Sequence, residues 1–254
     1  GGSIAVFPPP TVFFAAREVD TNLGYVWYRK DHDLRGEGAA APAVIVPDEI
    51  DGYAEAHTTP PEPLMAGLAE ETRSTMSAPG MLTGTVEGRF LEQLVFALQA
   101  KRVLELGTFT GYSSLSMAMG LPEGGHIDTC EVSEEHAEVA RRYHARSPYG
   151  DRITIHMGPA LETIERLGGE WDFVFVDADK ENYGNYYEAL VPRLAPAGLM
   201  AIDNTLWSGR VLDGDDDTET TRSIRELNDR IASDDRVVAV QLTVRDGVTL
   251  VRRR

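Results

Sequence analysis

Two aspartates and an asparagine, each placed at the end of an apolar run, form a set of oxygen donors. The run 173–177 ends in Asp177, and the run 199–203 ends in Asp203, which Asn204 follows. Because neighbouring parallel strands end at one edge of a sheet, we expect these residues to meet in one crevice. Mg²⁺ binds about six oxygens and keeps several positions for water or substrate. The pattern predicts a divalent-cation site built from both carboxylates and the Asn204 carbonyl.

Lys180 lies on the loop just after Asp177 and could accept a proton there. A phenol is mostly protonated at neutral pH and is then a weak nucleophile, so attack by its oxygen needs its deprotonation. A cation on three protein ligands leaves room for two adjacent hydroxyls of an aromatic diol and would fix their direction of attack. A solvated loop lysine is the simpler interpretation of Lys180 alone, but the two neighbouring acids favour a catalytic base.

A glycine turn between an apolar run and a helical pattern predicts a ligand-binding loop. The run 103–106 leads into Gly107 and Gly111, where close backbone approach to a ligand is possible, and Glu105 lies within the run. Dinucleotide sites use Gly-x-Gly-x-x-Gly, whereas the spacing here is Gly-x-x-x-Gly. A carboxylate at Glu105 would repel a pyrophosphate but would suit the cationic methionyl end of S-adenosylmethionine.

Glu131 ends the second apolar run, 24 residues after Gly107. An acid at that place can accept hydrogen bonds from both ribose hydroxyls of an adenosine ligand. Glu131 therefore favours an adenosine-bearing cofactor, and Glu105 with the glycine spacing favours S-adenosylmethionine over a nicotinamide dinucleotide. The simpler interpretation of Glu131 is a solvated strand end.

The elements that position these residues alternate between strand and helix patterns. Short apolar runs bounded by turn residues are expected strands, at 103–106, 126–132, 153–156, 173–177, 199–203, 237–244 and 248–252. Helical patterns separate the first five, at 112–119, 133–146, 160–167 and 181–193. Such alternation predicts right-handed crossovers and a parallel sheet covered on both faces. Asp246-Gly247 is a hairpin signal. We therefore predict an α/β fold with a mostly parallel seven-stranded sheet, helices on both faces and a C-terminal antiparallel hairpin.

The chain before the first strand divides into two regions. Residues 47–100 carry helical patterns from Pro47, from 64 to 75 and from 87 to 98, and Ile50 and Tyr53 share one face of the first. Residues 1–46 hold prolines, glycines and six large aromatics without a period, so they are expected to be an arm. Residues 1–3 look like an expression remnant. Residues 47–254 are expected to form one domain.

Composition excludes some partners. The net charge is −17 with a pI near 4.7, which opposes binding to nucleic acid and to anionic membranes. No apolar run approaches the ~20 residues of a membrane span. Cys130 is the single cysteine, so an intramolecular disulfide and a cysteine metal cluster are impossible, which fits a cytoplasmic protein.

Together these segments resemble the catechol and caffeoyl-coenzyme A O-methyltransferases, the cation-dependent group of class I methyltransferases with a Rossmann-like fold. The resemblance runs from about Thr75 to the C-terminus and rests on the segments 105–113, 158–160, 176–183, 202–211 and 246–250. It implies S-adenosylmethionine and Mg²⁺ or another divalent cation as cofactors, a small aromatic diol as acceptor, and a homodimer.

The resemblance also implies roles for particular residues. Asp177, Asp203 and Asn204 match metal ligands, Lys180 matches the catalytic base, and Asp179 and Trp207 match the acceptor side. Trp207 could equally be ordinary core. Residues that match cofactor contacts are Met81, Thr83, Glu105, Gly107, Ser113, Glu131, Gly158, Ala160 and Asp177.

Two rival functions remain open. One is a nicotinamide-dependent oxidoreductase, opposed by the missing glycine pattern, and the other is a non-catalytic adenosine-binding module, opposed by the complete ligand set and Lys180. Two segments depart from the family pattern. The arm at 1–46 has no counterpart, and the run 212–217 is strongly acidic. Acids bordering the site would disfavour a coenzyme A thioester relative to a free catechol, although a solvated loop is the simpler interpretation.

Overall fold

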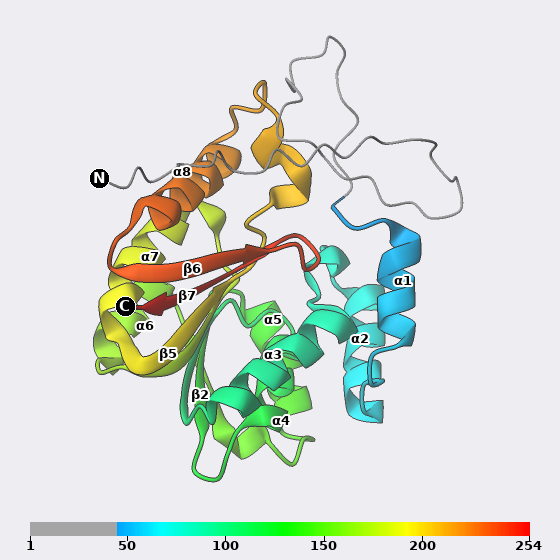
Figure 1. Ribbon diagram of the computed structural model, residues 1–254. Helices are drawn as coiled ribbons and strands as arrows, with labels where there is room; N and C mark the ends of the chain where they lie inside the picture. Colours follow the sequence, from blue (N-terminus) through cyan, green and yellow to red (C-terminus); the bar gives the residue numbers. More distant parts are fainter. Residues whose placement is uncertain (1–44) are drawn as a thin grey trace, which may run out of the picture. The chain divides into compact units, whose positions relative to one another are not determined.

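The computed structural model describes residues 45–254 (Figure 1). The predicted arm lies outside the described residues, except for Ile45 and Val46. Within residues 45–254, no helix is both long and apolar enough to cross a bilayer.

Seven strands form a single sheet in the order β3-β2-β1-β4-β5-β7-β6. Neighbouring strands from β3 to β5 are parallel, while β7 is antiparallel to both β5 and β6. This confirms the predicted parallel sheet with a C-terminal hairpin. The strand order reverses beside β1, where the crevice of such a sheet opens. The strands are β1 Arg102–Leu106, β2 His126–Glu131, β3 Ile153–Met157, β4 Trp171–Val176, β5 Leu194–Ile202, β6 Val237–Leu242 and β7 Val248–Arg253.

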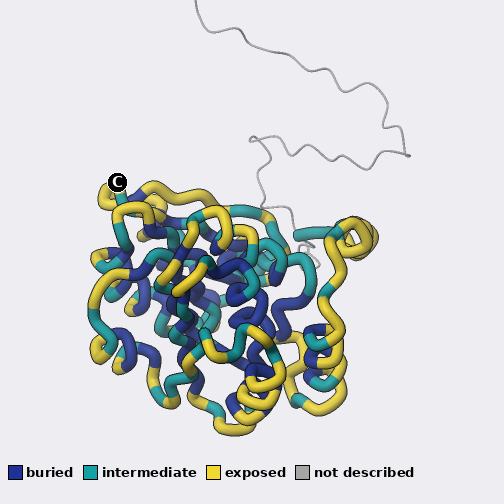
Figure 2. Tube along the Cα trace, turned by 90° about the horizontal axis from the view of Figure 1, so that it is seen from below, coloured by how far each residue is buried: buried dark blue, intermediate teal, exposed yellow. Residues whose placement is uncertain are grey.

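Helices cover both faces of the sheet because the strands are apolar on both sides. Val103 and Phe173 belong to the cluster beneath α3 and α4, whereas Leu104 and Val174 belong to the cluster beneath α6, α7 and α8. In Figure 2, the dark blue stretches of the tube, which are buried, lie toward the inside of the described domain. The helices are α3 Gly84–Leu98, α4 Tyr112–Gly120, α5 Glu134–His144, α6 Ala160–Leu167, α7 Tyr183–Leu190 and α8 Glu219–Ser233.

Two helices precede this sandwich. Helix α2 (Pro63–Thr75) buries Met65 and Leu68 in a cluster that also contains residues of α4 and α5. Helix α1 (Asp48–Ala56) buries none of its residues. The sequence predicted that Ile50 and Tyr53 share one face of this helix. That face is open to solvent, since Ile50 is 59% exposed and Tyr53 is 65% exposed.

The sequence analysis missed helix α8. It starts at Thr218, whose side chain accepts a hydrogen bond from the Thr221 amide, and it buries Ile224, Leu227 and Ile231. A second difference concerns the predicted helix 181–193. It is divided into 3₁₀ turns at Lys180–Asn182 and Val191–Arg193 on either side of α7, and Pro192 lies in the second turn.

Candidate active site

A cavity of about 1260 Å³ opens at the carboxyl edge of the sheet, where the predicted site residues converge. All of them except Glu105 line this one cavity: Met81, Thr83, Gly107, Ser113, Glu131, Gly158, Ala160, Asp177, Asp179, Lys180, Asp203, Asn204 and Trp207. Ligand pockets commonly measure about 300–1,000 Å³. The cavity therefore has room for two ligands side by side.

Sheet hydrogen bonds bring the two predicted metal ligands together. The Asp177 amide donates to the Leu106 carbonyl at 2.9 Å, and the Asp203 amide donates to the Val176 carbonyl at 3.0 Å. Both aspartates thus extend the ladder one residue past β4 and β5. Lys180 Nζ donates to Asp177 Oδ1 at 2.8 Å, so the predicted base contacts a predicted ligand directly.

Asp203 is poorly solvated, whereas the side chain of its neighbour Asp177 is 24% exposed. Asp203 is 5% exposed, and burial together with the charge of Asp177 raises its pKa to about 7. Its Oδ1 atom has no hydrogen-bond partner among the described residues. A buried carboxylate oxygen without a donor is costly unless a cation or a proton meets it. This arrangement fits a divalent cation held by Asp177, Asp203 and Asn204.

Glu87 is a third acid beside this pair, and the sequence analysis did not identify it as a site residue. It comes from the first turns of α3, is 2% exposed, and lines the cavity. Burial, followed by the charges of Asp203 and Asp177, raises its pKa well above the usual range. Even so, within residues 45–254 no three acids, histidines or cysteines converge in a group that could hold one ion. A cation would therefore depend on the Asn204 oxygen as well.

Glu105 lies behind the cavity wall rather than on it. Its carboxyl is completely buried, and burial raises its pKa to about 8 although hydrogen bonds from Ser113 and Thr129 oppose that rise. Oε1 has no partner among the described residues. Ser113 lines the cavity, so the methionyl contact expected of Glu105 would run beside Ser113 at the start of α4.

Glu131 is held at the end of β2 by three backbone amides. Oε2 accepts from the Phe109 amide at 2.7 Å, and Oε1 accepts from the amides of Val132 and Ser133 at 2.9 and 2.8 Å. The carboxyl group is 7% exposed, and His136 Nδ1 lies 3.6 Å from Oε1. The interpretation of Glu131 as a solvated strand end is therefore wrong, and its carboxylate is fixed at the cavity wall.

The two glycines of the β1–α4 turn are required by neighbouring protein atoms. Gly107 has φ 98°, and a Cβ there would lie 2.0 Å from the Asp177 carbonyl oxygen. Gly111 has φ 90°, and a Cβ there would lie 2.7 Å from Nε2 of His144. The sequence analysis predicted that these glycines let the backbone approach a ligand closely. At Gly107, the close approach is instead to the residue that follows β4.

The turn between β6 and β7 contributes residues that the sequence indicated only as a hairpin. Asp246 accepts from the Ser208 amide, and its carbonyl accepts from the Leu206 amide at 2.9 Å. The turn thereby holds the segment after β5, which carries Asn204 (φ 58°) and Trp207 (φ 47°). Positive φ values at non-glycine residues cluster at functional sites, where surrounding contacts maintain them.

Asp179 and Trp207 both line the cavity. Asp179 Oδ1 accepts from the Tyr186 hydroxyl at 2.5 Å, and Oδ2 accepts from Asn182, which ties this acid to α7. Trp207 is partly exposed and follows Asn204, so it forms cavity wall rather than core.

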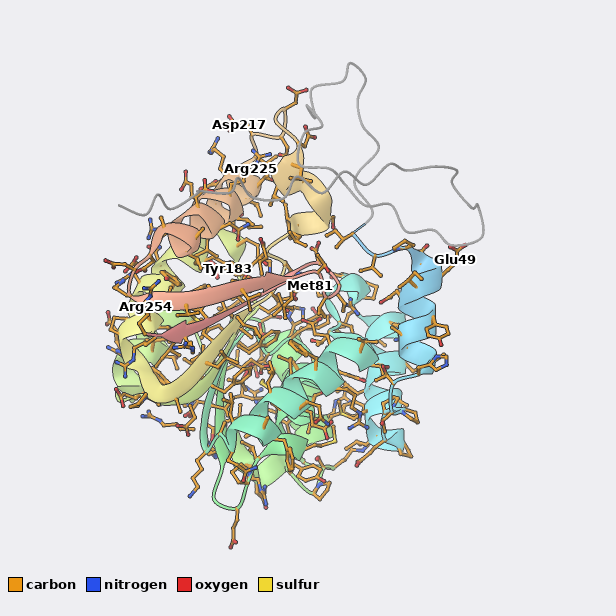
Figure 3. The ribbon with its side chains drawn as sticks, in the orientation of Figure 1. Glu49, Met81, Tyr183, Asp217, Arg225 and Arg254 are labelled. Atoms are coloured by element: carbon orange, nitrogen blue, oxygen red, sulfur yellow. The ribbon has the colours of Figure 1, made fainter. Side chains whose placement is uncertain are left out.

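The acidic run after β5 does not line the cavity. Asp216 accepts from Arg210 Nε at 2.6 Å and from the Thr221 hydroxyl at 2.9 Å. Arg225 of α8 donates to the carbonyls of Val211 and Asp216 at 3.0 and 2.8 Å, at the end of the molecule where Figure 3 labels Asp217 and Arg225. The run is therefore a loop tied to α8, and the expectation that its charges border the site is not supported.

An adenosine-type crevice with acids at the ends of β2, β4 and β5 defines a Rossmann-like enzyme that binds a nucleoside cofactor. The sequence profile of the O-methyltransferase family matches residues 55–254. A caffeoyl-CoA O-methyltransferase from Zea mays is 42% identical over 186 residues, which cover 68% of this chain and 70% of that protein.

Two solved structures of O-methyltransferases are similar to this chain in fold. The O-methyltransferase from Bacillus cereus in complex with SAH gives a TM-score of 0.75 at 29% identity, covering 81% of this chain and 97% of that one. TomG from Streptomyces achromogenes, in complex with SAM, gives 0.75 at 27% identity, covering 81% and 96%. The chain belongs to the O-methyltransferase family and is an S-adenosylmethionine-dependent enzyme. Neither a nicotinamide oxidoreductase nor a non-catalytic module is favoured.

Proposed function

We propose that this enzyme methylates one hydroxyl of a small catechol-like acceptor that is chelated by a divalent cation, with Mg²⁺ as the expected ion. The observation that carries the proposal is the buried Asp203 beside Asp177 at the cavity, with Lys180 Nζ 2.8 Å from Asp177 Oδ1. When bound, such a cation would stabilise the deprotonated acceptor oxygen. Asn204, beside Asp203, would complete the ligand set.

The chain's own residues have distinct tasks in this proposal. Lys180, as a neutral amine, accepts the proton of the acceptor hydroxyl and becomes an ammonium, and Asp177, which accepts a hydrogen bond from Nζ, keeps that nitrogen in place. Glu131 binds the ribose, and Ser113, backed by Glu105, contacts the methionyl end. The remaining cofactor contacts would be Met81, Thr83, Gly107, Gly158, Ala160 and Asp177, with Asp179 and Trp207 on the acceptor side.

The test compares catechol with guaiacol, its monomethyl ether, in the presence of labelled S-adenosylmethionine. Guaiacol keeps one hydroxyl but loses the second ionisable chelating hydroxyl, so it should accept little or no methyl. EDTA should abolish transfer to catechol, and Mg²⁺ or Mn²⁺ should restore it. Full turnover after exhaustive chelation would contradict the cation site. A coenzyme A thioester belongs in the panel, because relatives are named for caffeoyl-CoA and the acidic loop does not border the cavity.

We further propose a cytoplasmic homodimer with no nucleic-acid or membrane partner. The net charge of −17 opposes polyanions, and the lone Cys130 is buried. Val238 and Val240 are exposed on β6, the edge strand of the sheet, and an exposed apolar edge favours association with another chain.

A further inference from the structure

Arg245 is an unusual residue in the wall of the cavity. Apart from Lys180, it is the only lysine or arginine among the described residues that line the cavity. It lies in the β6–β7 turn with φ 47°, a conformation that favours glycine. A long cationic side chain at such a position persists only where the surroundings hold it, and such strain concentrates at functional sites.

Glu87 holds the Arg245 guanidinium at the cavity. Arg245 Nε lies 3.4 Å from Glu87 Oε2, and Glu87 is almost completely buried with Oε1 unpartnered in the described structure. A Cβ at Gly84 would lie 3.0 Å from Arg245 Nη1, so the guanidinium packs against the start of α3. Within residues 45–254, this contact with Glu87 is the only ion pair of Arg245, and the Arg245 side chain is still 37% exposed. Its two terminal nitrogens can therefore donate hydrogen bonds to a ligand in the cavity.

Resting on the proposed function, we propose that Arg245 binds the carboxylate of a short aromatic acid and so determines acceptor specificity. Glu87 lies against Asp177 and Asp203, which places the guanidinium one side chain from the proposed cation site. A carboxylate on a short substituent of a chelated catechol can reach that position, whereas the phosphates of a coenzyme A thioester are far from the ring. The planar guanidinium also matches a carboxylate with two parallel hydrogen bonds.

The experiment measures kcat and KM for 3,4-dihydroxycinnamate, its neutral methyl ester, its coenzyme A thioester and dopamine. The enzymes are the full chain, Arg245→Gln, Arg245→Gly and Arg245→Lys. Arg252→Gln is the matched control, since Arg252 is exposed on β7 and does not line the cavity. Arg245→Gly suits the positive φ, so its melting temperature should not fall, and loss of folding is separated from loss of recognition.

In the wild type, the acid should be preferred over the ester. In Arg245→Gln and Arg245→Gly, the ratio of kcat/KM for acid over ester should fall about ten- to hundredfold, mainly through KM of the acid. Arg245→Lys should keep part of the preference, and Arg252→Gln should keep all of it.

An unchanged acid-to-ester ratio in the Arg245 variants would overturn the proposal. The proposal would also be overturned if the wild type preferred dopamine and the Arg245 variants kept that preference. The acids of the cavity, rather than Arg245, would then determine which substrate charge the enzyme prefers. If only the thioester were affected, the bound group would be a phosphate and the carboxylate assignment would be wrong. If no catechol accepts methyl in any enzyme, the proposed function itself fails, which is a different result.

Discussion

Glu131 ends β2 and Lys180 lies on the loop after β4, so we expect their substitution to separate cofactor binding from proton transfer. Lys180→Ala should lower kcat by about 10²–10⁴-fold because a positioned base is lost, with little change in the Kd for S-adenosylmethionine. Calorimetry and steady-state kinetics measure both quantities. A normal kcat in this variant would show that another group removes the proton.

Glu131→Gln should weaken S-adenosylmethionine binding about tenfold or more while kcat at saturating cofactor is largely kept. An amide retains one acceptor oxygen, whereas Glu131 accepts from three backbone amides and, in the proposed function, would also accept from the ribose. Glu135→Gln, at an exposed position of α5, is the control. Unchanged cofactor affinity in Glu131→Gln would refute the ribose assignment.

Site residues at the ends of strands could be predicted from the sequence. Site residues that meet only through the packing of distant elements could not. Asp177 and Asp203 were identified because parallel strands place their last residues at one edge. Glu87 starts a helix and Arg245 sits in a hairpin turn, and their meeting depends on how α3 packs beside β7. Neither spacing nor periodicity carries that information.

At the scale of elements, α8 determines the shape of the loop after β5. Arg225 donates to the carbonyls of Arg210, Val211, Asp213 and Asp216. The sequence analysis missed α8 because its sequence is rich in charge and follows an acidic run, so its apolar stripe was not recognised. The alternating strands were recognised because each is a short apolar run.

Arg225→Ala should lower the free energy of unfolding by about 2 kcal/mol. The loop carbonyls would lose their charged hydrogen-bond donors, and hydrogen bonds to water would replace only part of the lost energy. Arg222→Ala is the matched control, because Arg222 is exposed and, among the described residues, its side chain hydrogen-bonds only to Asp217. Chemical denaturation of both variants compares the losses. Equal losses would show that Arg225 is no more important to the loop than a surface arginine.

His144, the last residue of α5, links folding stability to pH. Its ring lies against Gly111 and Ser114, and burial lowers its pKa to about 4 although a hydrogen bond with the Gly111 backbone opposes this. The unfolded value is about 6.5, so the unfolded chain binds the proton more readily in the window between these values. Stability from this group is complete above about pH 6.5 and is lost as pH falls toward 4.

From pH 7.5 to pH 5, His144 should therefore account for about 2 kcal/mol of lost unfolding free energy. His144→Gln removes the titration and should flatten the curve by that amount, even if the variant is less stable at every pH. Urea denaturation at several pH values measures the difference. Parallel curves for wild type and variant would contradict a buried neutral His144.

At the scale of the whole molecule, the prediction concerns the arm at residues 1–46, most of which lies outside the described residues. Residues 1–46 carry Phe13, Phe14, Trp27 and Tyr28, and burying each could contribute ~1.5–3 kcal/mol. We propose that the arm packs across a dimer interface near the acceptor site. Deleting residues 1–46 should then weaken the dimer in light scattering and raise the acceptor KM. A truncated protein that stays dimeric with unchanged KM would show that the arm folds elsewhere.

Strand β7 follows β6 along the chain but lies between β5 and β6 in the sheet. During synthesis on the ribosome, β5 therefore keeps an unpaired edge until β7 has emerged from the exit tunnel. The turn that holds Ser208 and carries Arg245 is made in the same last step. A nascent chain that lacks β7 consequently has neither a complete pocket wall nor a protected sheet edge, and an unpaired edge strand favours aggregation.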